Sequence, residues 1–130
     1  MWEYNGVEFL DENVGDYVGF VYIITNKKTN KKYIGKKLFT QAAARQVKGK
    51  RKKYRKASNW KEYFGSNKIL VEDVAKMGSE NFSREILHLC TSKGWCSVWE
   101  TFEILNRKAL WSDDFYNEWI SMKVRRSHLK

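Results

Sequence analysis

The sequence predicts an α+β domain, and three features of its 130 residues support this fold class. Two short runs rich in β-branched and aromatic residues, 19–26 and 31–36, flank a polar turn and predict a β-hairpin. A third apolar run, 82–89, predicts a central strand. Apolar residues at helical spacing predict helices over 69–77 and 92–109.

The ends of the chain differ in charge from one another. Residues 1–18 carry acids but no basic side chain, and Asn5-Gly6 between aromatic residues predicts a small β-hairpin or extended arm with a structural role. The last residues, 121–130, form a basic tail. We therefore expect an N-terminal acidic arm (1–18), a main domain (19–120) and a C-terminal tail (121–130).

The segment after the first hairpin is unusually basic. Thr40 as an N-cap and the run Ala42–Ala44 predict a short helix over 40–46. Residues 48–56 are too charged to be buried, so we expect them to be mobile alone and to become ordered against phosphates through counterion release. A helical turn that buries Trp60 should follow.

The distribution of charge points to a polyanionic partner. The formal net charge is +10, and residues 17–61 contain no Asp or Glu but fifteen of the 25 Lys and Arg residues. Such segregation creates a directional electrostatic field. The alternative is a basic loop that serves only solubility.

Other function classes are disfavoured. No apolar run is long enough to span a membrane and no signal-peptide pattern is present, so we expect a cytoplasmic protein without membrane contact. Cys90 and Cys96 are the only cysteines, the sequence around them does not complete a zinc set, and two reduced, buried thiols are favoured over a disulfide. His88 and His128 have no predicted functional role.

The helix over 92–109 presents two lines of side chains. One broad line is expected to be the buried face and consists of Trp95, Val98, Trp99, Phe102, Leu105 and Ala109. The second line contains Cys96, Glu100 and Ile104, and its carboxylate is a candidate functional group. Glu103 and Arg107 are spaced for a surface salt bridge.

The hairpin carries the residues of a known motif. Phe20-Val21-Tyr22, followed after the turn by Tyr33-Ile34-Gly35, resembles the two half-motifs of the GIY-YIG nuclease superfamily. Arg45, Glu100 and Tyr116-Asn117 fall where that superfamily has its arginine, glutamate and asparagine. The stretches 58–66 and 82–87 are similar to short phage-type members, so the resemblance covers about residues 19–120.

The resemblance implies a fold and a chemistry. The fold is a small three-stranded antiparallel sheet flanked by helices, here with an N-terminal β-hairpin arm. The activity is DNA endonuclease activity dependent on Mg²⁺ (or Mn²⁺), with Glu100 as metal ligand and Arg45 neutralising the scissile phosphate. Tyr22 would act as general base or water-orienting phenol, with Tyr33 as its partner and Asn117 completing the site. Lys36, Lys37 and the metal are expected to lower the pKa of Tyr22 so that it can act as a base.

The implied partner is double-stranded DNA. Its expected contacts are the basic side chains Lys36, Lys37, Lys48, Lys50, Arg51, Lys52, Lys53, Arg55 and Lys56. A phage or mobile-element nuclease of the homing type, acting in the host cytoplasm, is the expected role. Specificity is expected from the loop 46–58, the arm or a homodimer.

Alternatives remain for each assignment. Ala42–Ala44 lie where many superfamily members carry basic residues, so the working arginine could be missing, or Lys48 or Arg51 could replace it. The chain would then be a catalytically weak or inactive DNA-binding module. Glu100 could be an ordinary solvated helix residue, and Tyr22 a plain core residue. A ribosome-type RNA-binding protein would explain the charge but not the tyrosines and Glu100.

Overall fold

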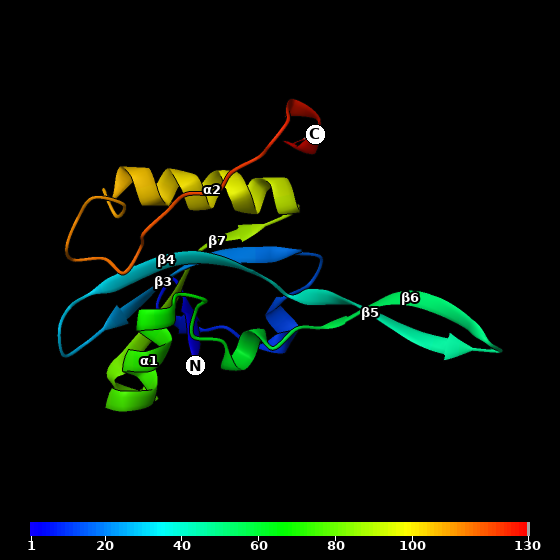
Figure 1. The fold of residues 1–130 in the computed structure, drawn as a ribbon, viewed down its shortest axis with the longest axis horizontal. Helices are drawn as coiled ribbons and strands as arrows, with labels where there is room; N and C mark the ends of the chain where they lie inside the picture. Colours follow the sequence, from blue (N-terminus) through cyan, green and yellow to red (C-terminus); the bar gives the residue numbers. More distant parts are fainter. Residues whose placement is uncertain (130) are drawn as a thin grey trace.

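A five-stranded sheet forms the centre of the molecule in the computed structural model, which describes residues 1–129 (Figure 1). The strand order is β2-β1-β7-β3-β4, with β1 parallel to β7 and every other pair antiparallel. The strands are β1 (Trp2–Tyr4), β2 (Val7–Glu8), β3 (Gly19–Asn26), β4 (Lys32–Leu38) and β7 (Phe82–Cys90). Lys130, the end of the expected basic tail, lies outside the described residues.

The α+β class is confirmed, but the expected number of strands was wrong. The hairpin and the third strand form as expected, and the N-terminal segment adds two more strands to the same sheet. It does so because β1 aligns with the free edge of β7, where Trp2 pairs with Arg84 and Tyr4 with Ile86. The Trp2 side chain is buried there.

Helices cover both faces of the sheet (Figure 1). Helix α2 (Lys93–Asn106) lies on one face, and α1 (Lys68–Met77) on the other. Asn67 and Ser92 cap them by accepting hydrogen bonds from the backbone nitrogens of Leu70 and Trp95. Both predicted helices are confirmed, although α2 ends at Asn106 rather than Ala109. The short 3₁₀ turns are η1 (Asp11–Asn13), η2 (Trp60–Glu62), η3 (Ser79–Asn81) and η4 (Arg126–Leu129).

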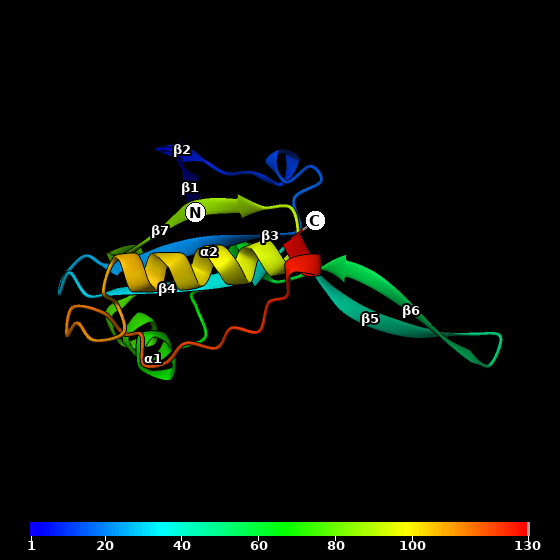
Figure 2. The same ribbon diagram turned by 90° about the horizontal axis from the view of Figure 1, so that it is seen from above.

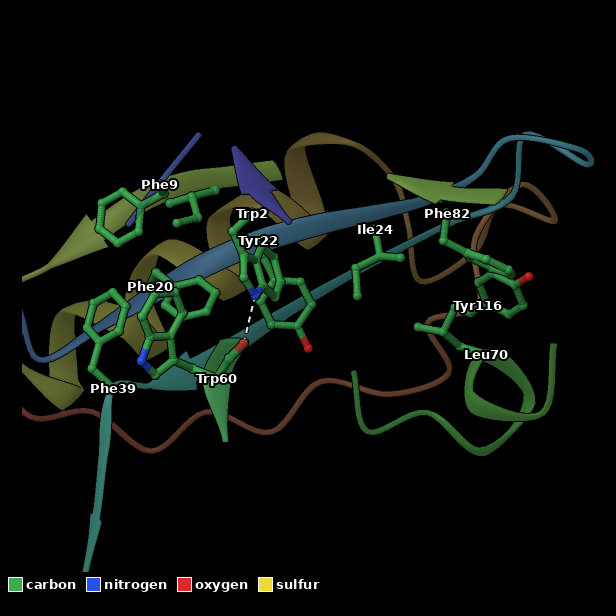
Figure 3. Packing of buried hydrophobic residues seen from close by; sticks show 11 residues of the cluster. Trp2, Phe9, Phe20, Tyr22, Ile24, Phe39, Trp60, Leu70, Phe82 and Tyr116 are labelled. Atoms are coloured by element: carbon green, nitrogen blue, oxygen red, sulfur yellow. Dashed lines mark hydrogen bonds between the residues drawn. The ribbon is translucent and has the colours of Figure 1, made fainter. Parts of the chain in front are cut away.

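The core has two layers because successive side chains of β3 point to opposite faces. Phe20, Tyr22 and Ile24 pack on the α1 side (Figure 3). Val21 and Ile23 pack on the α2 side. In the first layer the indole nitrogen of Trp2 donates a 2.7 Å hydrogen bond to the carbonyl oxygen of Trp60 (Figure 3).

The buried face of α2 is only partly the one expected from the sequence. Trp95 and Trp99 of the expected line pack against the core and Ala109 is buried, but Phe102 and Leu105 are 47% and 48% exposed. Cys96 and Ile104 of the second line are buried instead, because packing against β3 and β4 turns the helix toward that line. The two cysteines are free and buried, as expected.

The expected Glu103–Arg107 pair forms, with an exposed arginine and a buried carboxylate. Glu103 is 8% exposed and accepts a 2.7 Å hydrogen bond from Arg107 Nε. Its other oxygen lies 2.9 Å from Nε2 of His88, whose ring stacks on Trp99 at 4.5 Å between centroids. These hydrogen bonds and charges hold the pKa of Glu103 below its usual value, although burial raises it.

A long two-stranded hairpin projects from the body of the molecule (Figure 2). It consists of β5 (Thr40–Val47) and β6 (Lys50–Ala57), paired over their full length, and we call residues 40–57 the basic ribbon. The expected helix over 40–46 is therefore wrong, and the stretch 48–56 forms the hairpin turn and most of β6. Lys48 and Gly49 have φ of 51° and 75°, as a two-residue hairpin turn of type I′ requires. Cross-strand hydrogen bonds thus override the helix preference of the alanines.

The chain returns to the outer edge of β4 near its C-terminal end. The backbone nitrogen of Tyr116 donates to the carbonyl oxygen of Lys32 at 2.7 Å. The backbone nitrogen of Lys32 in turn donates to the carbonyl oxygen of Asp114 at 2.9 Å. This pairing covers an edge strand that would otherwise be open. Within residues 1–129 no helix is long and apolar enough to cross a membrane.

Candidate functional site

A pocket of about 290 Å³ lies where β4, α2 and the C-terminal segment meet. We call it the candidate pocket. It brings together four of the five catalytic residues expected from the sequence, with Lys36 beside them. These lining residues are Tyr22, Tyr33, Lys36, Glu100 and Asn117.

The two halves of the sequence motif meet across the β3–β4 pair. Tyr22 lies directly opposite Gly35, and a Cβ atom on Gly35 would be 2.6 Å from Cζ of the Tyr22 ring. Only glycine leaves room for this phenol. The spacing of the hairpin therefore explains why a tyrosine in the first strand accompanies a glycine in the second.

The tyrosine hydroxyls are held in their protonated form. Burial, and then the neighbouring phenols of Tyr63 and Tyr33, raise the pKa of Tyr22 well above its usual value. Burial also raises the pKa of Tyr33, although a hydrogen bond with Ser66 at 3.3 Å opposes this. Without a metal ion the pKa of Tyr22 is therefore raised rather than lowered, because desolvation dominates.

Glu100 presents a free carboxylate to the pocket. Burial raises its pKa, and the charge of Lys36 opposes this. Within residues 1–129 the carboxylate forms no hydrogen bond or ion pair. Lys36 is instead held by a 2.6 Å hydrogen bond from Nζ to Ser97 Oγ, on the same face of α2.

The donor set fits a hard divalent cation. Glu118 also lines the pocket, so it offers two carboxylates together with amide and hydroxyl oxygens. Mg²⁺ prefers oxygen ligands and keeps several waters, so one or two carboxylates are enough. No group of three His, Cys, Asp or Glu residues gathers anywhere in the described part of the chain.

Asn117 is used by the fold itself. Its Oδ1 accepts from the backbone nitrogen of Ile34 at 3.0 Å, and its Nδ2 donates to the carbonyl oxygen of Ile34 at 2.8 Å. The side chain thus continues the pairing of the C-terminal segment with β4. The neighbouring Tyr116 donates its hydroxyl to Asp73 at 2.7 Å, which ties the same segment to α1.

Arg45 is not in the candidate pocket. It lies on β5, with its guanidinium over the Tyr54 ring at 5.6 Å from the centroid. The pocket contains no arginine, and Lys36 is its only basic side chain. The other expected DNA contacts from 48 to 56 are all exposed along the basic ribbon.

Two serines that contact side chains of the pocket were missed by the sequence reasoning. Ser97 precedes Glu100 by three residues, and this spacing on a helix could have indicated a shared face. Ser66 follows Gly65, whose φ of 89° allows the turn that brings the serine to Tyr33. No local pattern indicated that contact.

Comparison with protein-family models matches residues 2–120 to the family described as "Putative endonuclease segE, GIY-YIG domain". In the same comparisons, neither a curated protein nor a solved structure matches the chain. The matched range contains every strand and both α-helices of the described residues, and all five pocket residues named at the start of this subsection.

Proposed function

Because the chain belongs to the family of GIY-YIG domains described for the putative endonuclease segE, we propose that it is a metal-dependent endonuclease that hydrolyses phosphodiester bonds of double-stranded DNA. The proposal includes a phage or mobile-element role of the homing type, which the resemblance to short phage-type members supports. The observation that carries it is the meeting of Tyr22, Tyr33, Lys36 and an unpaired Glu100 in one pocket.

Each residue has a defined task in this proposal. Glu100 holds Mg²⁺ or Mn²⁺, which supplies charge neutralisation and an activated water when bound. Lys36 contacts an oxygen of the scissile phosphate and balances part of the charge that develops on it. Asn117 keeps Ile34, and with it the end of β4 that carries Lys36, in register with the C-terminal segment.

The tyrosines act as hydrogen-bond donors in the resting protein. A phenol whose pKa is raised cannot accept a proton at neutral pH, but it can orient a water molecule or a phosphate oxygen. Tyr22 therefore orients the nucleophilic water, and Tyr33, on β4, supports Tyr22 in this role. A role for Tyr22 as general base requires a nearby cation to lower its pKa.

Plasmid cleavage by the purified protein tests the proposal. With Mg²⁺ or Mn²⁺ we expect nicked or linear DNA, and none in EDTA. Glu100→Gln should reduce the cleavage rate roughly 100-fold or more, because a metal site is worth several kcal/mol. It should leave DNA binding intact. The matched control is Glu72→Gln, an exposed carboxylate on α1 that does not line the pocket.

A second candidate function follows from the position of Arg45. Since the candidate pocket contains no arginine, a catalytically weak or inactive DNA-binding module remains an alternative. Tight, salt-sensitive binding without metal-dependent cleavage would favour this module. Cleavage that survives in Glu100→Gln would instead show that the metal lies elsewhere.

A further inference from the structure

A second hollow lies beside the candidate pocket, between the base of the basic ribbon and the N-terminal end of α2. Four cations from three elements line it: Lys36 and Lys37 of β4, Arg55 of β6 and Lys93 of α2. We call it the cationic groove. No carboxylate lines it, and none of the four cations forms an ion pair within residues 1–129.

Three of the four cations, Lys36, Lys37 and Arg55, contact neutral partners. Arg55 donates from Nη2 to the backbone carbonyl and the hydroxyl of Thr40, at 2.8 and 3.0 Å, and from Nε to the same hydroxyl at 3.2 Å. Nζ of Lys37 lies 4.3 Å from the centroid of the Tyr63 ring. Neutral partners fix the positions of these groups without cancelling their charge, and such sites bind anions well.

The groove and the candidate pocket share Lys36 as a common wall. A single negatively charged chain can therefore occupy both at once. Beyond the groove, the basic ribbon runs away from the body of the molecule (Figure 2). The cations of β6 are exposed along it. The order pocket, groove, ribbon describes a continuous path for a phosphate backbone.

We propose that the cationic groove binds a backbone phosphate of the DNA next to the scissile one and so sets which bond enters the pocket. This proposal rests on the nuclease function proposed above. In this proposal Lys93 and Arg55 contact the phosphate next to the scissile one, whereas the cations at the tip of the basic ribbon contact phosphates farther away. Contacts of this type position a duplex without reading its sequence.

The salt dependence of DNA binding, measured in EDTA, provides the first test. The variant Arg55→Gln/Lys93→Gln should lower the slope of log K against log salt by about one, because the groove holds one phosphate and each lost phosphate contact removes about 0.9. The control Lys27→Gln/Lys76→Gln removes the same charge from exposed sites away from the groove and should change the slope much less. Equal slopes for the two variants would overturn the proposal. Circular dichroism verifies that both variants fold.

A neutral methylphosphonate at single positions beside the mapped nick provides the second test. At one adjacent position, the methylphosphonate should slow cleavage by the wild type. It should not change the cleavage rate of Arg55→Gln/Lys93→Gln, which already lacks the contact. Slowing of equal size in both proteins would contradict the groove contact. If the salt slope changes as expected but the wild type does not cleave DNA, the nuclease function is rejected and the groove remains a phosphate site.

Discussion

The size of Gly35 controls the position of Tyr22, the most buried polar aromatic residue of the candidate pocket. The phenol fills the space where any other side chain at position 35 would begin. Tyr22 also contacts Trp2 and Phe20 in edge or tilted ring pairs. One residue therefore belongs to both the core and the candidate pocket, which couples stability to the proposed function.

Gly35→Ala tests this coupling. Because the new methyl group overlaps the Tyr22 ring, we expect a loss of about 1–3 kcal/mol in the free energy of unfolding, measured in urea. Tyr22→Ala removes the obstacle, so the double variant should be more stable than the sum of the two single losses implies. Strictly additive losses would show that the two residues do not compete for space.

The raised pKa of Tyr22 predicts a loss of stability at alkaline pH. Above about pH 10 the unfolded chain releases the phenolic proton while the folded chain retains it. The free energy of unfolding should then fall by about 1.4 kcal/mol per pH unit for each retained proton. Tyr33 and Tyr116 contribute in the same direction, since their pKa values are also raised.

Urea unfolding between pH 8 and 11 measures this effect. The decline should be shallower for Tyr22→Phe, which has no proton to retain at that position. Tyr54→Phe, on the exposed ribbon, should follow the wild type. An identical decline in wild type and Tyr22→Phe would mean that the buried phenol does not control alkaline stability.

At the scale of elements, the basic ribbon is the part of the fold that projects from the sheet and its helices (Figure 2). Every residue of β6 is exposed, and the ribbon is held chiefly by its own cross-strand pairing. On its paired strands, small residues such as Ala42 and Ala44 lie opposite Arg55 and Lys53. Such a strand pair has dimensions that the major groove of DNA accepts.

Neutralising the outer part of the ribbon tests its electrostatic role. Replacing Lys50, Arg51, Lys52 and Lys53 by Gln should weaken binding to all DNA sequences and flatten its salt dependence. The fold should be unaffected, because these side chains are exposed. A fluorescence titration at several salt concentrations gives the slope.

The control for this variant carries the same change in net charge. It replaces the exposed residues Lys27, Lys28, Lys76 and Lys108, which lie off the ribbon. A ribbon variant with the slope of this control would rule out the ribbon as the electrostatic footprint. The salt slope of the ribbon variant should therefore be the smaller of the two.

At the scale of the whole molecule, the N-terminal segment completes the core. Trp2 is 2% exposed, donates to the Trp60 carbonyl, and has the Arg84 guanidinium 4.8 Å from its ring centre. Phe9 packs on Phe39 in the same cluster. The first nine residues thus connect the edge of the sheet to the loop that follows the ribbon.

Trp2→Ala should consequently lower the free energy of unfolding by about 3–5 kcal/mol, the usual cost of removing a buried large aromatic side chain. Thermal or urea unfolding followed by circular dichroism measures the loss. Trp111→Ala, at a site that is 62% exposed, is the matched control and should change stability by about 0.5 kcal/mol or less. Similar losses in both would place the N-terminal segment outside the cooperative core.

Local patterns in the sequence were sufficient for the hairpin of β3 and β4, the strand β7, the two helices and the two buried thiols. Each depends on neighbouring residues: alternation, helical spacing, caps such as Ser92, and turn residues. The same stretches carry the tyrosines, Gly35 and Glu100, so most of the candidate pocket could be predicted. The run of basic residues without acidic ones over 17–61 likewise indicated a polyanionic partner.

Contacts between distant residues settled the rest. The buried stripe of α2 depends on packing against β3 and β4, and the fourth and fifth strands depend on pairing of Trp2–Tyr4 with β7. The ribbon forms because cross-strand hydrogen bonds outweigh the helix preference of Ala42–Ala44, and it carries Arg45 away from the pocket. Helix propensity and periodicity are properties of short segments, whereas strand pairing and burial are free energies of the assembled fold.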